Sequence, residues 1–171
     1  AGSDFVDTSG TLTLAADETT AVIRVPVNGD DAPEVHETFT VTLSNPSNAV
    51  LADAQATATI RNDDTPEITI NDVQCQERQA CVFTVRLSGP SSELVTVNFG
   101  TRDGSAQAVY DYQAQRVTLR FTPGQTQLTI GVNAFDDGVN LGDSPEVFFV
   151  ELWAPVNGII ARTTGTGTIN P

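Results

Sequence analysis

The sequence predicts an all-β protein built from immunoglobulin-like β-sandwiches. Apolar and polar residues alternate along several short runs, and Gly, Pro, Asn and Asp cluster between the runs. Threonine and valine, which favour extended backbone, are abundant in them. No stretch shows the apolar spacing of an amphipathic helix. Because alternation gives each strand one wet and one dry face, we expect pairs of sheets packed over a shared core.

Seven runs are expected to be strands. Five of them alternate clearly: residues 21–27, 38–43, 82–87, 95–99 and 128–132. Two shorter runs, 57–60 and 68–70, flank the polar segment 62–66, which holds two adjacent aspartates and a proline. Since proline restricts the backbone, we interpret this segment as a joint between two modules.

The charge of the chain excludes several classes of partner. It has 22 acidic and 8 basic residues and a net charge of −14. This charge repels phosphate backbones and anionic lipids, so we expect no nucleic-acid binding. No apolar run approaches the roughly 20 residues of a membrane helix, so we expect no membrane insertion. No signal peptide is seen, and we interpret the chain as a processed protein or a fragment.

The two cysteines, Cys75 and Cys81, lie close together in the sequence. The single histidine, His36, is not near them, so a zinc site would lack ligands. We therefore expect a disulfide between the cysteines. A disulfide indicates an oxidising compartment and fits an extracellular or cell-surface protein.

The sequence also repeats itself. The similar pairs are residues 1–5 with 108–112, 11–14 with 118–121, 37–43 with 146–152, and 56–60 with 165–169. The offset is 107 residues in the early pairs and 109 in the later ones. A period near one hundred residues indicates tandem domains. We expect residues 65–171 to form a complete domain, and residues 1–64 to form the C-terminal part of a domain that lacks its opening strands.

Several short motifs carry the repeat. They are Gly2-Ser3-Asp4-Phe5, Ser9-Gly10-Thr11-Leu12-Thr13-Leu14, Glu37-Thr38-Phe39, Leu43-Ser44-Asn45-Pro46, Ile60-Arg61-Asn62-Asp63-Asp64 and, in the second copy, Thr101-Arg102-Asp103-Gly104-Ser105-Ala106. In this order and spacing they resemble the Calx-beta domain, an immunoglobulin-like sandwich. The resemblance implies extracellular or regulatory modules in tandem, many of which bind calcium at one end of the sandwich. By composition the chain is most similar to the Calx-beta domains that occur in large bacterial surface proteins.

The resemblance also implies a set of calcium ligands, which come from five places in each domain. In the second copy they fall on Glu77, Asp103, Asp136, Asp137, Asp143 and Glu146, and in the first on Asp30, Asp31, Glu34, Glu37, Asp63 and Asp64. The acidic pair that closes the domain reads Asn170-Pro171 in the second copy. The second copy therefore lacks that pair, and the first copy lacks counterparts of Glu77 and Asp103, so each copy holds an incomplete set of the oxygens that calcium needs. The alternative, that these acids are solvated surface charge, stays open.

An enzymatic role is not expected. His36 would have to serve any nucleophilic triad, and no serine is placed near it for that role. One tryptophan, Trp153, and two tyrosines offer little platform for sugars, so the paired carboxylates do not indicate a glycosidase.

Two functional hypotheses remain. In the first, the chain is a non-enzymatic structural or adhesive segment of a secreted or cell-surface protein, with calcium as its candidate stiffening ligand. Its partners are neighbouring domains of the same polypeptide or further copies of itself. In the second, the chain is a subunit of a self-assembling extracellular filament. Its incomplete first domain is then completed by strands from another chain.

Overall fold

The computed structural model describes residues 4–136 and 144–171. Among these residues, the regular structure consists of strands, and no helix is long and apolar enough to cross a bilayer. The chain divides into two compact units. The first unit comprises residues 1–32 and 36–61, and the second comprises residues 33–35 and 62–171.

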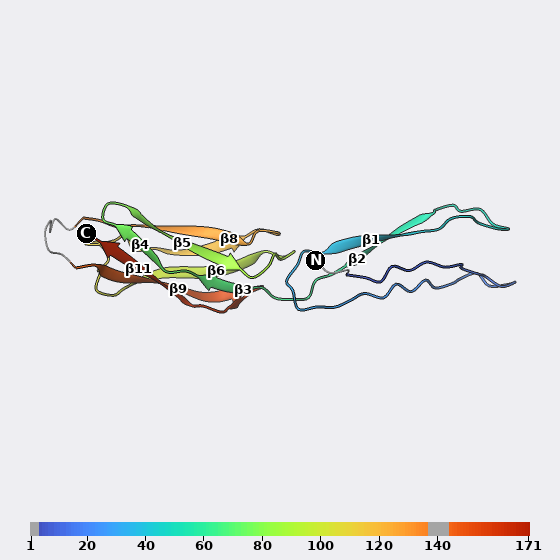
Figure 1. Cartoon of the computed structure of the whole chain (residues 1–171), viewed down its shortest axis with the longest axis horizontal. Helices are drawn as coiled ribbons and strands as arrows, with labels where there is room; N and C mark the ends of the chain where they lie inside the picture. The colour runs from blue at the N-terminus through green and yellow to red at the C-terminus, as the bar shows by residue number, and fades with distance from the viewer. Residues whose placement is uncertain (1–3, 137–143) are drawn as a thin grey trace. The chain divides into compact units, whose positions relative to one another are not determined.

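The second unit is a two-sheet sandwich (Figure 1). Its strands are β3 (Glu67–Ile70), β4 (Val73–Gln76), β5 (Ala80–Leu87), β6 (Val95–Asp103), β7 (Arg116–Phe121), β8 (Gln127–Asn133), β9 (Glu146–Val156), β10 (Ile159–Ile160) and β11 (Thr164–Asn170). One sheet has the order β10-β3-β5-β8 and the other has the order β4-β11-β9-β6-β7. Neighbours are antiparallel except for the pairs β10-β3 and β11-β4. The predicted all-β sandwich is confirmed.

Alternation places the core of the second unit between its two sheets. In β5, the side chains of Phe83, Val85 and Leu87 are buried and those between them are more exposed, as their spacing predicts. Phe83 packs edge-on against Phe148 of β9, with ring centroids 5.8 Å apart. Eleven of the twenty buried apolar residues found in the described part of the chain lie between Ile68 and Ala106. The opening strands therefore supply about half of this core.

The expected disulfide joins Cys75 to Cys81, with their Cα atoms 5.1 Å apart. Cys75 lies on β4 and Cys81 on β5, and these strands belong to different sheets. The bond therefore links the two layers of the sandwich across a short turn.

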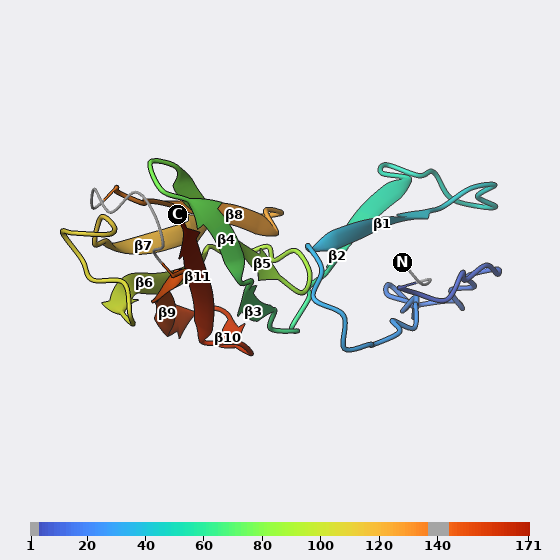
Figure 2. The same cartoon turned by 60° about the vertical axis from the view of Figure 1, so that its left-hand side comes forward.

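The first unit has much less regular structure. Its named strands are β1 (Glu37–Thr42) and β2 (Gln55–Ile60), which form one antiparallel pair. The prediction of a strand over residues 21–27 is wrong, since only Val27 makes a bridge, to Phe5. No residue from 4 to 61 is buried. Figure 2 shows the β1-β2 hairpin opposite the N-terminal part of the chain, which is drawn without strands.

The β1-β2 hairpin reproduces the register of β9-β11. Glu37 pairs with Ile60 in the first unit, and Glu146 pairs with Ile169 in the second. Each of these partners is displaced by the same 109 residues. The internal repeat seen in the sequence is thus also a repeat of backbone pairing.

The N-terminal segment shows the same correspondence at the offset of 107 residues. Phe5 bridges Val27 in the first unit, and Tyr112 bridges Ala134 in the second. Phe5 stacks on Phe39 with ring centroids 4.7 Å apart, and Tyr112 stacks on Phe148 at 4.5 Å. Equivalent rings therefore meet in both units, although only the second unit buries them.

Candidate metal centre

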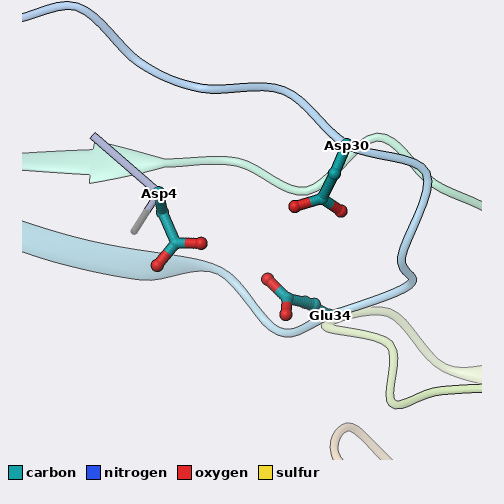
Figure 3. Close-up of side chains that lie close together, drawn as sticks. All are labelled: Asp4, Asp30 and Glu34. Atoms are coloured by element: carbon teal, nitrogen blue, oxygen red, sulfur yellow. The ribbon is translucent and has the colours of Figure 1, made fainter. Parts of the chain in front are cut away.

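Three carboxylates gather near the N-terminal segment. Asp4, Asp30 and Glu34 each offer an oxygen, and these oxygens all lie within 4.8 Å of one another. Figure 3 shows the three side chains directed toward a common space. Asp4 and Glu34 are half-buried and Asp30 is exposed. A search of the described residues for three acidic, histidine or cysteine side chains close enough to share a metal ion finds this one group.

Local hydrogen bonds fix the backbone around two of these acids. The carbonyl of Asp4 accepts a bond from the amide of Asn28 at 2.9 Å, which holds the N-terminal segment beside the loop that follows Val27. The Oδ1 atom of Asp30 accepts a bond from the amide of Ala32 at 2.8 Å. This short turn keeps the Asp30 side chain close to its own loop. The two aspartates of the first unit are therefore positioned by backbone contacts.

The remaining acids predicted in the first copy are placed as follows. Asp31 and Asp63 are exposed, Asp64 is half-buried, and Glu37 is exposed at the start of β1. The carbonyl of Asp64 accepts a bond from the Asn62 side-chain amide at 3.0 Å. None of these four acids belongs to the group of three carboxylates.

In the second copy, the described candidates do not gather in this way. Glu77, Asp103, Asp136 and Glu146 form no group of three oxygens within 4.8 Å among the residues described. Glu146 is half-buried at the start of β9. Asp137 and Asp143 lie outside the described residues. The Glu77 amide donates to the carbonyl of Asn170 at 3.0 Å.

Asp136 is paired with an arginine. The guanidinium of Arg78 forms an ion pair with the Asp136 carboxylate. The Arg78 side chain is 74% exposed and the Asp136 side chain only 15%. The cation next to this predicted ligand is therefore part of the protein.

Asp103 accepts two hydrogen bonds that shape the loop after β6. Its Oδ1 atom accepts one from the Tyr112 hydroxyl and one from the Ala108 amide at 2.9 Å. These bonds, the hydroxyl first, hold the pKa of Asp103 below its usual value. Burial, together with the nearby Asp103 charge, raises the pKa of Tyr112 above its usual value. Asp103 is thus ionised at neutral pH and anchors the loop.

Sequence reasoning missed Asp4 as a candidate ligand and Arg78 as a counter-ion. Asp4 lay in a repeated motif, but its approach to Asp30 depends on the Phe5-Val27 bridge, which brings segments distant in sequence together. Arg78 sits beside Glu77, yet nothing in the sequence pairs it with a residue far along the chain.

Both copies of the repeat match one family of domains. The Calx-beta domain family matches residues 1–64 and again residues 66–168. The chain belongs to the Calx-beta family. Two successive matches agree with the repeat of sequence and of backbone pairing.

The curated relatives that the chain matches are much longer proteins. The chain is 28% identical over 171 residues to adhesion G-protein coupled receptor V1 of Danio rerio, covering 92% of this chain and 3% of the receptor. It is 30% identical over 160 residues to extracellular matrix protein 3 of Lytechinus variegatus, covering 87% and 5%. It is 37% identical over 81 residues to human sodium/calcium exchanger 3, covering 46% and 8%. The chain thus spans less than a tenth of each relative.

Two solved Calx structures have a similar fold. The apo-form Calx CBD1 domain aligns with a TM-score of 0.56 at 22% identity, over 62% of this chain and 96% of that one. The CBD12 structure from CALX1.2 aligns with a TM-score of 0.54 at 23% identity, over 60% and 44%. At these identities the likeness shows a common Calx-beta fold.

Proposed function

We propose that the chain is a non-enzymatic structural segment of a secreted or cell-surface protein, in which acidic loops of Calx-beta units bind calcium and stiffen the protein. The observation that carries the calcium proposal is the gathering of Asp4, Asp30 and Glu34. Hard carboxylate oxygens are the ligands that calcium prefers. Without a cation, negative charges this close repel one another.

The rest of the molecule supports a structural role. The disulfide between Cys75 and Cys81 suits an oxidising environment. The relatives named as an adhesion receptor and a matrix protein suggest the same extracellular setting. Eight other carboxylates predicted as ligands lie in the described residues outside this group. Calcium can complete its shell with backbone carbonyls and water.

A calcium titration of the full chain tests the proposal. We expect heat of binding and a rise in melting temperature with calcium and a smaller response to magnesium, which demands a tighter octahedral shell. Asp30→Asn should weaken the response. Asp53→Asn removes the same charge from an acid outside the group and serves as the matched control. If calcium gives no heat and no thermal shift in the unsubstituted protein, the proposal is wrong and these acids are solvated surface charges.

A second candidate function is strand acceptance, as in a self-assembling filament. Its specific support is that the first unit buries none of its described residues. A groove of about 490 Å³ opens in this unit, and apolar side chains contribute to its lining: Phe5, Ile23, Val25, Phe39 and Val41. An open groove that is partly lined by apolar side chains and lies beside an edge strand is the kind of surface that accepts added strands.

The repeat indicates which strands would fill the groove. The counterpart of β1 is β9, which pairs with β11 on one side and with β6 on the other, whereas β1 has β2 as its one neighbour among the described strands. The counterpart of residues 20–26 is β8, which pairs with β5. The expected occupant therefore has the alternating pattern of β5 and β6, and under the self-assembly hypothesis another chain supplies it.

Sedimentation over a range of protein concentrations tests this second function. We expect concentration-dependent assembly that Ile23→Asp, in the groove, abolishes. Val50→Asp places the same charge at a side chain that is 92% exposed and outside the groove, and it should leave assembly unchanged. A monomer at every concentration would exclude self-assembly.

A further inference from the structure

The turn between β4 and β5 places the side chain of Arg78 against Asp136 of the second unit. Arg78 lies in this turn with a left-handed backbone, at φ 62°, which is uncommon for a residue other than glycine. From there its guanidinium reaches the Asp136 carboxylate. Asp136 follows β8, so the pair joins two segments that are distant in sequence.

The turn is held on several sides. The disulfide closes its base. The Gln79 amide donates to the Gln76 carbonyl at 3.2 Å, and the Gln79 carbonyl accepts a bond from the Ala134 amide at 2.8 Å. The Asn170 side-chain amide donates to the Cys75 carbonyl at 3.2 Å. Arg78 is therefore presented to Asp136 by a constrained backbone, even though its own side chain is largely exposed.

Asp136 needs a counter-charge at this place. Its side chain is mostly buried, and a buried carboxylate is stable only when paired or hydrogen-bonded. A divalent cation could supply that charge, but an arginine already in contact repels it and occupies carboxylate oxygen.

We propose that Arg78 is the resident counter-ion of this end of the second unit, that it positions Asp136 without metal, and that it opposes divalent cations there. The part of this inference that concerns cations rests on the proposed calcium function. The part that concerns Asp136 stands on the ion pair alone.

The metal-free test compares melting temperatures in excess chelator. We expect Arg78→Gln to lower the melting temperature by about 4 °C and Arg78→Lys to restore part of the loss. Arg120→Gln removes the same charge from an exposed position on β7 and should have no such effect. In an Asp136→Asn background, Arg78→Gln should cost nothing further. Equal melting temperatures for Arg78→Gln and Arg120→Gln would overturn the counter-ion role.

The metal test uses terbium ions, which substitute for calcium and emit when excited through nearby aromatic rings. Both tyrosines and the tryptophan lie in the second unit, so sensitised emission reports on that unit. We expect Arg78→Gln to tighten terbium binding about fivefold, with calcium as competitor, and Arg120→Gln to leave it unchanged. Unchanged affinity in Arg78→Gln would overturn the opposition to cations. If no variant gives sensitised emission, the opposition to cations in the second unit is overturned. The metal-free result still decides the counter-ion role of Arg78, and the calcium titration decides the calcium function.

Discussion

The two units have the same backbone pairing in one hairpin, but they differ in whether the aromatic side chains packed on it are buried. In both, a hairpin has the same register and an aromatic ring of the N-terminal segment stacks on a ring of that hairpin. In the second unit those rings, Tyr112 and Phe148, are 1% and 0% exposed. In the first unit their counterparts, Phe5 and Phe39, are only half-buried. The comparison indicates that the register of the hairpin is set locally. A buried core also needs the opening strands, which in the second unit supply about half of the buried apolar residues.

Truncating the equivalent aromatic side chains sets the two units apart most strongly. Phe148→Ala removes a fully buried ring from the second unit and should lower the free energy of unfolding by about 3–5 kcal/mol. Phe39→Ala removes a half-buried ring from the first unit and should cost less than about 1 kcal/mol. Denaturation followed by the fluorescence of Trp153, the single tryptophan, reports the second unit. An equal shift of this transition by both variants would erase the distinction between the units.

Gly167 and its counterpart in the first unit allow a second comparison of how tightly the two units are packed. A Cβ atom at Gly167 of β11 would lie 2.5 Å from the Phe148 ring, which is too close for any real contact. Its counterpart in the first unit is Ala58, which pairs with Phe39 in the same way. Gly167→Ala should therefore destabilise the second unit by about 1–3 kcal/mol through overpacking.

The matched substitution Ala58→Gly, in the first unit, is the control for this prediction. We expect it to leave the Trp153 transition unchanged, because the strand concerned belongs to the other unit. A second unit that tolerates Gly167→Ala at no cost would show that its sheets are less tightly packed than the structure indicates.

The disulfide is a constraint that belongs to the second unit. Replacing Cys75 and Cys81 together by serine should lower the free energy of unfolding by about 2 kcal/mol, because the closed loop is short and the chain entropy it removes is modest. Thermal melts of the variant beside the oxidised and reduced forms of the unsubstituted protein measure this. If reduction leaves the melt unchanged while the variant is destabilised, the serines rather than the lost bond are responsible.

The smallest effect concerns a hydroxyl that only the second unit has. Tyr112→Phe makes its stacked ring chemically equal to Phe5 of the first unit and removes the hydrogen bond to Asp103. We expect a loss of about 1 kcal/mol at neutral pH. Circular dichroism melts of the two proteins measure it, and an unchanged melt would mean that the hydroxyl contributes nothing.

The same variant makes a prediction about pH. Because the pKa of Tyr112 is raised in the folded state, its stabilisation is fully present below the ordinary tyrosine value near 10 and is lost as pH rises above that value. Stability should therefore decline less between pH 10 and pH 12 in Tyr112→Phe than in the unsubstituted protein. Parallel alkaline declines would contradict the raised pKa.

Alternation in the sequence determined the strands that have partners within the chain. The runs at 82–87, 95–99 and 128–132 fall within β5, β6 and β8, because their apolar faces meet across one sandwich. The equally regular run at 21–27 forms no named strand. Its counterpart, β8, is held by pairing with β5, and no equivalent of β5 pairs with residues 21–27 in the described structure. A period of two shows which face is apolar, but a strand exists only when a second strand satisfies its backbone.

The sequence by itself determined the fold class, the repeat, the cysteine pair and the residue types that could bind a cation. These follow from local patterns and from similarity between segments of one chain. Only the tertiary structure decided which carboxylates meet: it brings Asp4 to Asp30, engages Asp103 with Tyr112 and sets Arg78 against Asp136. The physical reason is that a charge is governed by neighbours within a few ångströms, and strand pairing selects those neighbours from distant parts of the chain.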